Sequence, residues 1–168
     1  RDGILNNAII KDRLPYSPRS INEVKINHGI KIALDSLKAQ NYLLLVVSNQ
    51  PDVARRVIKK YDVEKINQYL SQRLPLDKFF ICYHDDNDYC NCRKPLPGML
   101  LAGAKEFDID LRRSYMIGDR WKDIAAGRSA GCKTLFVDFE YNEPKPKYAD
   151  FTVSSLPDAV RIITELNY

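Results

Sequence analysis

Short apolar segments recur along the chain and predict β-strands. They lack the two-residue alternation of a strand with one face in water, so we expect strands that are buried on both faces of a sheet. These segments are Tyr42–Val47, Lys78–Cys82, Ser114–Ile117, Thr134–Val137 and Asp150–Val153.

Segments with helical periodicity alternate with the predicted strands. Their apolar residues recur every three or four positions and therefore share one face of a helix. Asp62 is the predicted N-cap of the second helix, and Gly131 is the predicted end of the fourth. We expect the helices within residues 26–37, 63–70, 100–107, 121–130 and 156–166.

This alternation predicts an α/β fold, a Rossmann-like three-layer sandwich with a central parallel sheet. The chain of 168 residues fits one domain, residues 1–168, without a large cap domain. Apolar residues make up 45% and charged residues 29%, which is typical of globular proteins. The segment from Asn142 to Lys147, with two prolines, is expected to be a surface loop rather than a domain boundary.

Charge and hydropathy limit the partners that we expect. The net charge of +4 is mild, and no Lys/Arg tract resembles a nucleic-acid footprint. No apolar run approaches the roughly 18 residues that a membrane span needs. We therefore expect neither nucleic acid nor membrane as a partner, and a small anionic substrate suits the charge.

Polar residues follow three of the predicted strands. Ser48, Asn49 and Gln50 follow the first strand, a cysteine-rich segment follows the second, and Gly118 and Asp119 follow the third. Ligands bind beyond the carboxyl ends of the strands in an open parallel sheet. Taken singly, each group could be an ordinary turn. Together they predict an active site at this edge.

The cysteine-rich segment has the spacing C-x-H-x5-C-x-C, formed by Cys82, His84, Cys90 and Cys92. Three thiolates and one imidazole are a closed tetrahedral ligand set, as in structural zinc sites. A disulfide is a weaker interpretation because a Cys90–Cys92 ring would be strained, and iron–sulfur ligation usually needs four cysteines. Cys132 is expected to be a small core residue.

Two cations, Arg93 and Lys94, come directly after this segment. An isolated Arg-Lys pair is normally a solvated surface feature. Here a metal-bound loop would hold their backbone rigidly, which suits the recognition of a phosphate. The carboxylates of the loop, Asp85, Asp86 and Asp88, are expected to be solvated.

Four motifs in order resemble the haloacid-dehalogenase superfamily of phosphatases. The first is the end of D-x-D-G-x-x-N at Arg1–Asn6, and the others are Val47–Gln50, Cys92–Pro95 and Gly118–Asp123. With the zinc loop, they resemble the heptose 1,7-bisphosphate phosphatase branch, and histidinol-phosphate phosphatases are its neighbours. One departure is Pro51-Asp52, where heptose phosphatases usually have Ser-Gly.

The resemblance implies a Mg²⁺-dependent reaction through an aspartyl-phosphate, with structural Zn²⁺ nearby. The nucleophilic Asp would stand just before Arg1, and we expect that it and the first strand precede Arg1 in the natural protein. Asp2 would be the general acid and base. The remaining implied roles are phosphoryl binding by Ser48 and Lys94, substrate contact by Asn49, Gln50, Arg93 and Arg120, and Mg²⁺ binding by Asp119, Asp123 and the main-chain carbonyl of Asp2.

Other interpretations stay open. The chain could be a histidinol-phosphate phosphatase or, without the first Asp, an inactive zinc-stapled scaffold. The phosphatase interpretation predicts a cytoplasmic monomer with reduced thiols. The sequence leaves open the sugar, its anomer and the phosphate that is removed.

Overall fold

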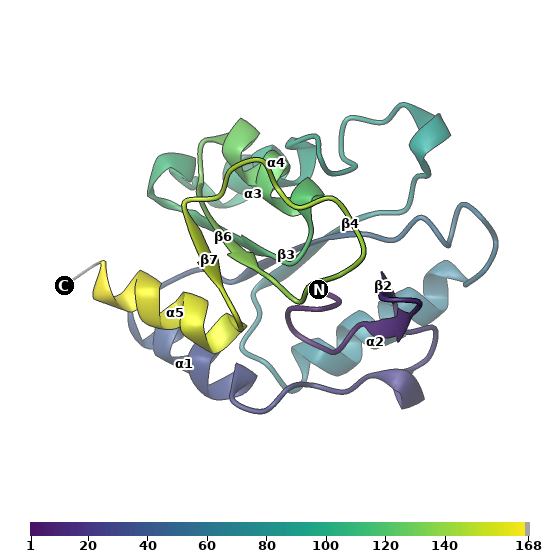
Figure 1. The fold of residues 1–168 in the computed structure, drawn as a ribbon, viewed down its shortest axis with the longest axis horizontal. Coiled ribbons are helices and arrows are strands. Elements are labelled where there is room, and N and C mark those ends of the chain that lie inside the picture. The colour runs from purple at the N-terminus through teal and green to yellow at the C-terminus, as the bar shows by residue number, and fades with distance from the viewer. Residues whose placement is uncertain (167–168) are drawn as a thin grey trace.

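The computed structural model describes residues 1–166, and Figure 1 shows how the elements of these residues are arranged. The helices are α1 Ile30–Ala39, α2 Lys60–Ser71, α3 Gly98–Phe107, α4 Trp121–Ala130 and α5 Leu156–Glu165, with short 3-10 helices η1 Ile21–Glu23, η2 Asp86–Asp88 and η3 Leu111–Arg113. The strands are β1 Ile9–Lys11, β2 Leu14–Tyr16, β3 Leu45–Asn49, β4 Lys78–Cys82, β5 Tyr115–Gly118, β6 Lys133–Val137 and β7 Phe151–Val153.

The alternation predicted from the sequence is confirmed, with small shifts at the ends of elements. Strand β3 begins later than predicted, at Leu45, and continues through Ser48 to Asn49. The predicted N-cap of the second helix was wrong. Helix α2 begins at Lys60, so Asp62 lies in its first turn, where a negative charge still favours the positive end of the helix. Gly131 ends α4 as predicted, in the left-handed conformation with φ of 88°.

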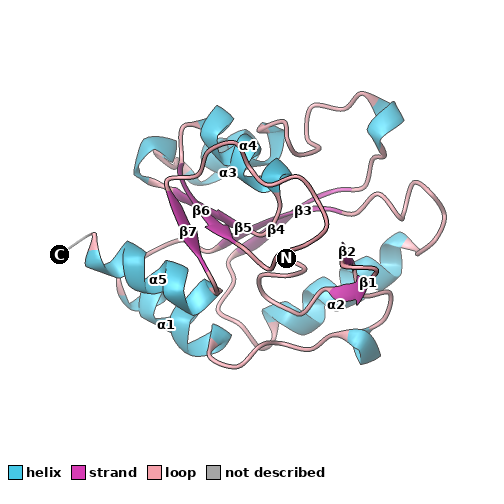
Figure 2. Cartoon of the chain, in the orientation of Figure 1, coloured by secondary structure: helices cyan, strands magenta, loops and turns pink. Residues whose placement is uncertain are grey.

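Helices cover both faces of the strands, which gives the predicted three layers (Figure 2). Helices α1 and α5 pack against each other and form most of the larger hydrophobic cluster with β3, β6 and α2. On the other face, a smaller cluster joins Val47, Met99, Met116 and Cys132, so Cys132 is a core residue as expected. None of the helices in the described residues is long and apolar enough to cross a bilayer.

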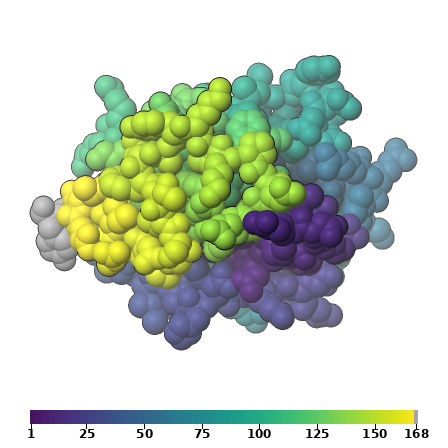
Figure 3. Space-filling model, viewed as in Figure 1, coloured from purple at the N-terminus to yellow at the C-terminus, as the bar shows by residue number. Residues whose placement is uncertain are grey.

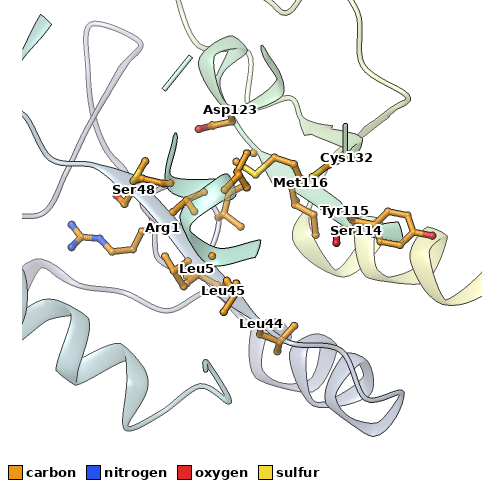
Figure 4. A pocket seen from close by; sticks show the side chains of 18 of the residues that line it. Arg1, Leu5, Leu44, Leu45, Ser48, Ser114, Tyr115, Met116, Asp123 and Cys132 are labelled. Carbon is orange, nitrogen blue, oxygen red and sulfur yellow. The ribbon is translucent and has the colours of Figure 1, made fainter. Parts of the chain in front are cut away.

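The parallel strands form two sheets, which corrects the prediction of one central sheet. Strand β3 pairs with β4, and β5 pairs with β6, which pairs with β7; within residues 1–166 no ladder joins β3 to β5. Between β3 and β5 lies a pocket of about 530 Å³, lined by residues of both strands (Figure 4). An antiparallel hairpin, β1–β2, was not predicted because its strands have three residues each.

Candidate active site and metal centres

Asp2 lies in a tight turn at the mouth of the pocket. The turn needs Gly3, whose φ is 87° and whose missing side chain leaves room for the Asp119 carboxylate. The guanidinium of Arg1 grips Asp2 at 2.9 Å and 3.0 Å. The amides of Asn6 and Gln50 also donate to Asp2, at 3.1 Å and 2.9 Å. The Asp2 carboxylate is therefore held by four hydrogen bonds.

These contacts keep Asp2 ionised. Burial alone would raise its pKa, but the charge of Arg1 and the hydrogen bonds from Arg1 and Gln50 lower the pKa well below its usual value. An ionised Asp2 is ready to accept a proton from water. To donate a proton to a leaving group, Asp2 must first be protonated and released from part of this network.

Asp119 and Asp123, which follow β5, form a buried pair of carboxylates. Gly118 leaves room for the Asp123 side chain, because a Cβ at this position would lie 2.2 Å from the Asp123 Cβ. Burial and then the charge of Asp123 raise the pKa of Asp119 to about 7. Burial would also raise the pKa of Asp123, but its ion pair with Lys94 lowers it. Two buried oxygen ligands that repel each other fit a hard cation such as Mg²⁺.

Lys94 brings a cation into this carboxylate site. Its Nζ lies 2.7 Å from the Asp123 carboxylate and donates to the main-chain carbonyl of Val47 at 2.9 Å. Asn49 fixes the backbone of Lys94 from both sides, accepting from its N–H at 3.1 Å and donating to its carbonyl at 3.0 Å. Lys94 is buried, so the cation is fixed in place and shielded from water.

The predicted residues after β3 divide between the pocket and its support. Ser48 is buried beside the pocket and accepts a hydrogen bond from Gln50 at 2.9 Å. Gln50 links Ser48 to Asp2 through its amide nitrogen. In this structure, Asn49 and Gln50 bind protein groups, so substrate contact by these two stays a prediction.

The loop after β6 carries two residues that the sequence did not single out. Tyr141 is hydrogen-bonded to Asp119, and burial, then the charge of Asp119, raise the pKa of its hydroxyl. Glu143 grips Arg120 through both carboxylate oxygens, one of them at 2.8 Å from Nε. The loop is on the surface as predicted, and it also contacts the hairpin, where Asn142 donates to the Arg13 carbonyl at 2.9 Å (Figure 3). No spacing motif marks these residues.

The side chain of Arg93 contacts residues of its own loop, between β4 and α3, whereas the side chain of Lys94 enters the pocket. The Arg93 Nε lies 2.7 Å from the Asp86 carboxylate, and its Nη1 donates to the His84 carbonyl at 3.4 Å. Asp86 is exposed, as expected, and it is also ion-paired, which the sequence did not predict. Arg120 lines the pocket and pairs with Glu143, whereas Arg93 lies outside the pocket lining and pairs with Asp86. Substrate contact by both arginines stays a prediction.

The four predicted zinc ligands come together after β4. Their donor atoms lie within 4.8 Å of one another. The Cys82 sulfur is 3.6 Å from His84 Nδ1 and 3.7 Å from the Cys90 sulfur, and the Cys92 sulfur is 3.3 Å and 3.5 Å from the same two partners. Ligands of a tetrahedral zinc ion are separated by about 3.5–3.8 Å, given its bond lengths. The four cysteines are free, so the distances fit a metal and not a disulfide.

The structure thus gathers Asp2, Ser48, Lys94, Asp119 and Asp123 around one pocket. Figure 4 shows Ser48 and Asp123 among the residues that line it. The cysteine cluster is a separate site on the loop that leads to Lys94.

Comparison with known proteins places these features among phosphatases. Residues 91–159 match a family model described as HAD-hydrolase-like. The chain is 36% identical to the D-glycero-alpha-D-manno-heptose-1,7-bisphosphate 7-phosphatase of Campylobacter jejuni, over 90% of this chain and 84% of that protein. It is 33% identical to the D-glycero-beta-D-manno-heptose-1,7-bisphosphate 7-phosphatase of Pasteurella multocida, over 87% of each.

A solved structure agrees with these relatives. The D,D-heptose 1,7-bisphosphate phosphatase of B. bronchiseptica, complexed with magnesium and phosphate, matches with a TM-score of 0.83 and 25% identity, over 99% of this chain and 96% of that chain.

Proposed function

Because the chain belongs to the HAD-like phosphatase family that includes these heptose-bisphosphate phosphatases, we propose that it removes the 7-phosphate from a D-glycero-D-manno-heptose 1,7-bisphosphate. One observation carries the proposal. Asp2, Lys94, Asp119 and Asp123 converge at the carboxyl ends of parallel strands around a single pocket. The relatives differ in the anomer that they use, so both anomers are candidate substrates.

The pocket between β3 and β5 supports our proposal for the nucleophile of the reaction. Its lining is mainly apolar and includes residues of β3 and β5, which belong to parallel strand pairs, so one more parallel strand would fit between them. In our proposal this strand leads into Arg1, which lines the pocket, and the residue before Arg1 is Asp. It would stand two positions before Asp2, with only Arg1 between them, so both side chains would face the same site.

In the proposed reaction, that Asp attacks phosphorus as Asp2 gives a proton to the departing sugar oxygen. Asp2 then takes a proton from the water that hydrolyses the aspartyl-phosphate. Lys94 and Ser48 hold the phosphoryl oxygens, and the fixed charge of Lys94 offsets the charge of the phosphate. Asp119, Asp123 and the Asp2 carbonyl would hold Mg²⁺, which supplies further neutralisation of carboxylate and phosphate.

We also propose that Cys82, His84, Cys90 and Cys92 hold a structural Zn²⁺. The tetrahedral spacing of their donor atoms supports this assignment. A closed four-ligand site leaves no position for substrate, so the metal would order the loop that leads to Arg93 and Lys94. The free cysteines are consistent with our further proposal of a reducing, cytoplasmic location, and we propose a monomer.

A substrate panel on a chain that includes the residues before Arg1 tests the function. It should contain both heptose 1,7-bisphosphate anomers, fructose 1,6-bisphosphate and histidinol phosphate, each with Mg²⁺. We expect a heptose bisphosphate to give the highest kcat/KM. Preference for histidinol phosphate would support the neighbouring branch instead. A residue other than Asp before Arg1, with no turnover, would support the inactive scaffold.

A further inference from the structure

A single exposed carboxylate, that of Asp86, is surrounded by three cations. Its Oδ1 lies 2.7 Å from Arg93 Nε and 3.8 Å from Lys122 Nζ, and its Oδ2 lies 3.6 Å from Arg55 Nη2. The three cations come from three places in the chain: the loop after β3, the loop after β4 and the first turn of α4. Three positive side chains therefore surround one acidic side chain, and Arg55 also pairs with Asp52 and Asp85.

The Asp86 contacts are ones that an external anion can replace. The Asp86 side chain is 61% exposed, and ion pairs that involve exposed side chains contribute little to stability. A phosphate carries more charge than a carboxylate and has three acceptor oxygens. It could therefore satisfy Arg93, Lys122 and Arg55 together better than Asp86 does.

Two of these cations are next to pocket residues in the sequence. Arg93 directly precedes Lys94, and Lys122 directly precedes Asp123. Lys94 and Asp123 form the buried ion pair of the pocket. Lys122 itself lines the pocket. A substrate with one phosphate at Lys94 could extend its other end toward Asp86.

We propose that Asp86 is a specificity-determining residue that occupies the position of the phosphate that stays on the sugar. The proposal rests on the proposed bisphosphatase function. A bisphosphate displaces Asp86 and binds the three cations. A substrate without a second phosphate leaves them paired with Asp86 and gains nothing from them.

The test is Asp86→Asn, with KM measured for heptose 1,7-bisphosphate and for p-nitrophenyl phosphate, which has no second phosphate. Asn keeps the shape of the side chain and the N–H by which residue 86 donates to Asp85. We expect KM for the bisphosphate to fall about threefold to tenfold, with kcat and the p-nitrophenyl phosphate kinetics unchanged. Zinc content, measured alongside, checks that the loop is intact.

Asp35→Asn is the matched control, because Asp35 is an exposed partner of Lys31 on α1 and its loss changes the net charge equally. This variant should leave both KM values unchanged. An unchanged or higher bisphosphate KM in Asp86→Asn overturns the inference, since Asp86 would then be neutral or would help to position Arg93. If wild-type protein hydrolyses p-nitrophenyl phosphate but no sugar bisphosphate, the proposed function itself fails.

Discussion

The carboxylate pocket and the cysteine–histidine loop are both suited to metals, but in opposite ways. In the pocket, Asp119 and Asp123 are buried, and burial, followed by the charge of Asp123, raises the pKa of Asp119. In the loop, Cys90 and Cys92 are only half-buried, and their sulfur atoms complete a compact four-atom set with Cys82 and His84. The first site offers hard oxygen ligands, whereas the second offers soft ligands and a closed shell.

The difference lies in what each site does with its charge. A buried carboxylate that forms no ion pair with a side chain of residues 1–166, such as Asp119, is available to a metal ion that binds the reacting phosphate. A closed ligand set stabilises a loop without contributing a reacting group. The two regions meet at Arg93 and Lys94, which directly follow Cys92.

The largest expected effect comes from Asp119→Asn, which sharpens the comparison on the carboxylate side. Loss of one ligand charge should lower kcat/KM about a hundredfold to a thousandfold, or about 3–4 kcal/mol, and weaken Mg²⁺ binding. Zinc content should stay at that of the wild type. Steady-state kinetics over a Mg²⁺ titration measure the first effect, and metal analysis the second. Loss of zinc in this variant would show that the two centres are not independent.

The next effect tests the loop alone. Cys90→Ser should remove the zinc and lower Tm, because metal binding orders the loop, and should lower kcat/KM about tenfold to a hundredfold by releasing Arg93 and Lys94. Cys132→Ser is the control, since Cys132 is a buried cysteine that is not one of the four predicted zinc ligands. It should keep its zinc. Wild-type kcat/KM in a zinc-free, folded Cys90→Ser protein would disprove the link between loop and pocket.

The junction between the regions can be divided by kinetics. Lys94→Ala should mainly lower kcat, because Lys94 is buried beside Asp123, where the phosphoryl group would react. Arg93→Ala should mainly raise KM, since Arg93 lies outside the pocket lining and pairs with Asp86. Each loss of a charge-assisted contact corresponds to about 1.5–3 kcal/mol, or roughly tenfold to a hundredfold in kcat/KM. Thermal melts should accompany the Lys94 variant, which leaves Asp123 without its cation. The same change in KM and kcat for both variants would contradict this division.

The smallest effect concerns the loop after β6. Tyr141→Phe removes only the hydroxyl that is hydrogen-bonded to Asp119, so Mg²⁺ affinity should fall about twofold to tenfold, equivalent to about 0.5–1.5 kcal/mol. Tyr148→Phe, on an exposed tyrosine of the same loop, should change nothing. A Mg²⁺ titration of activity compares the two variants. Equal curves would mean that Tyr141 only packs against the site.

Several features followed from the sequence because their causes are local. Strand and helix periodicity depends on residues a few positions apart. For this reason α4 and β4 have their predicted bounds, and α3 ends at its predicted last residue. The spacing of the Cys82 ligand set and the position of the pocket residues at strand ends are also local features. The structure places each group of residues close together, as expected from the sequence.

Other features depended on contacts between distant parts of the chain. Asn49 clamps the Lys94 backbone, Tyr141 reaches Asp119, and Arg93 turns to Asp86 instead of the pocket, and no local pattern encodes these pairings. Short stretches of sequence thus determine which side chains a site contains, whereas the packing of strands and loops determines which partner each charged side chain has.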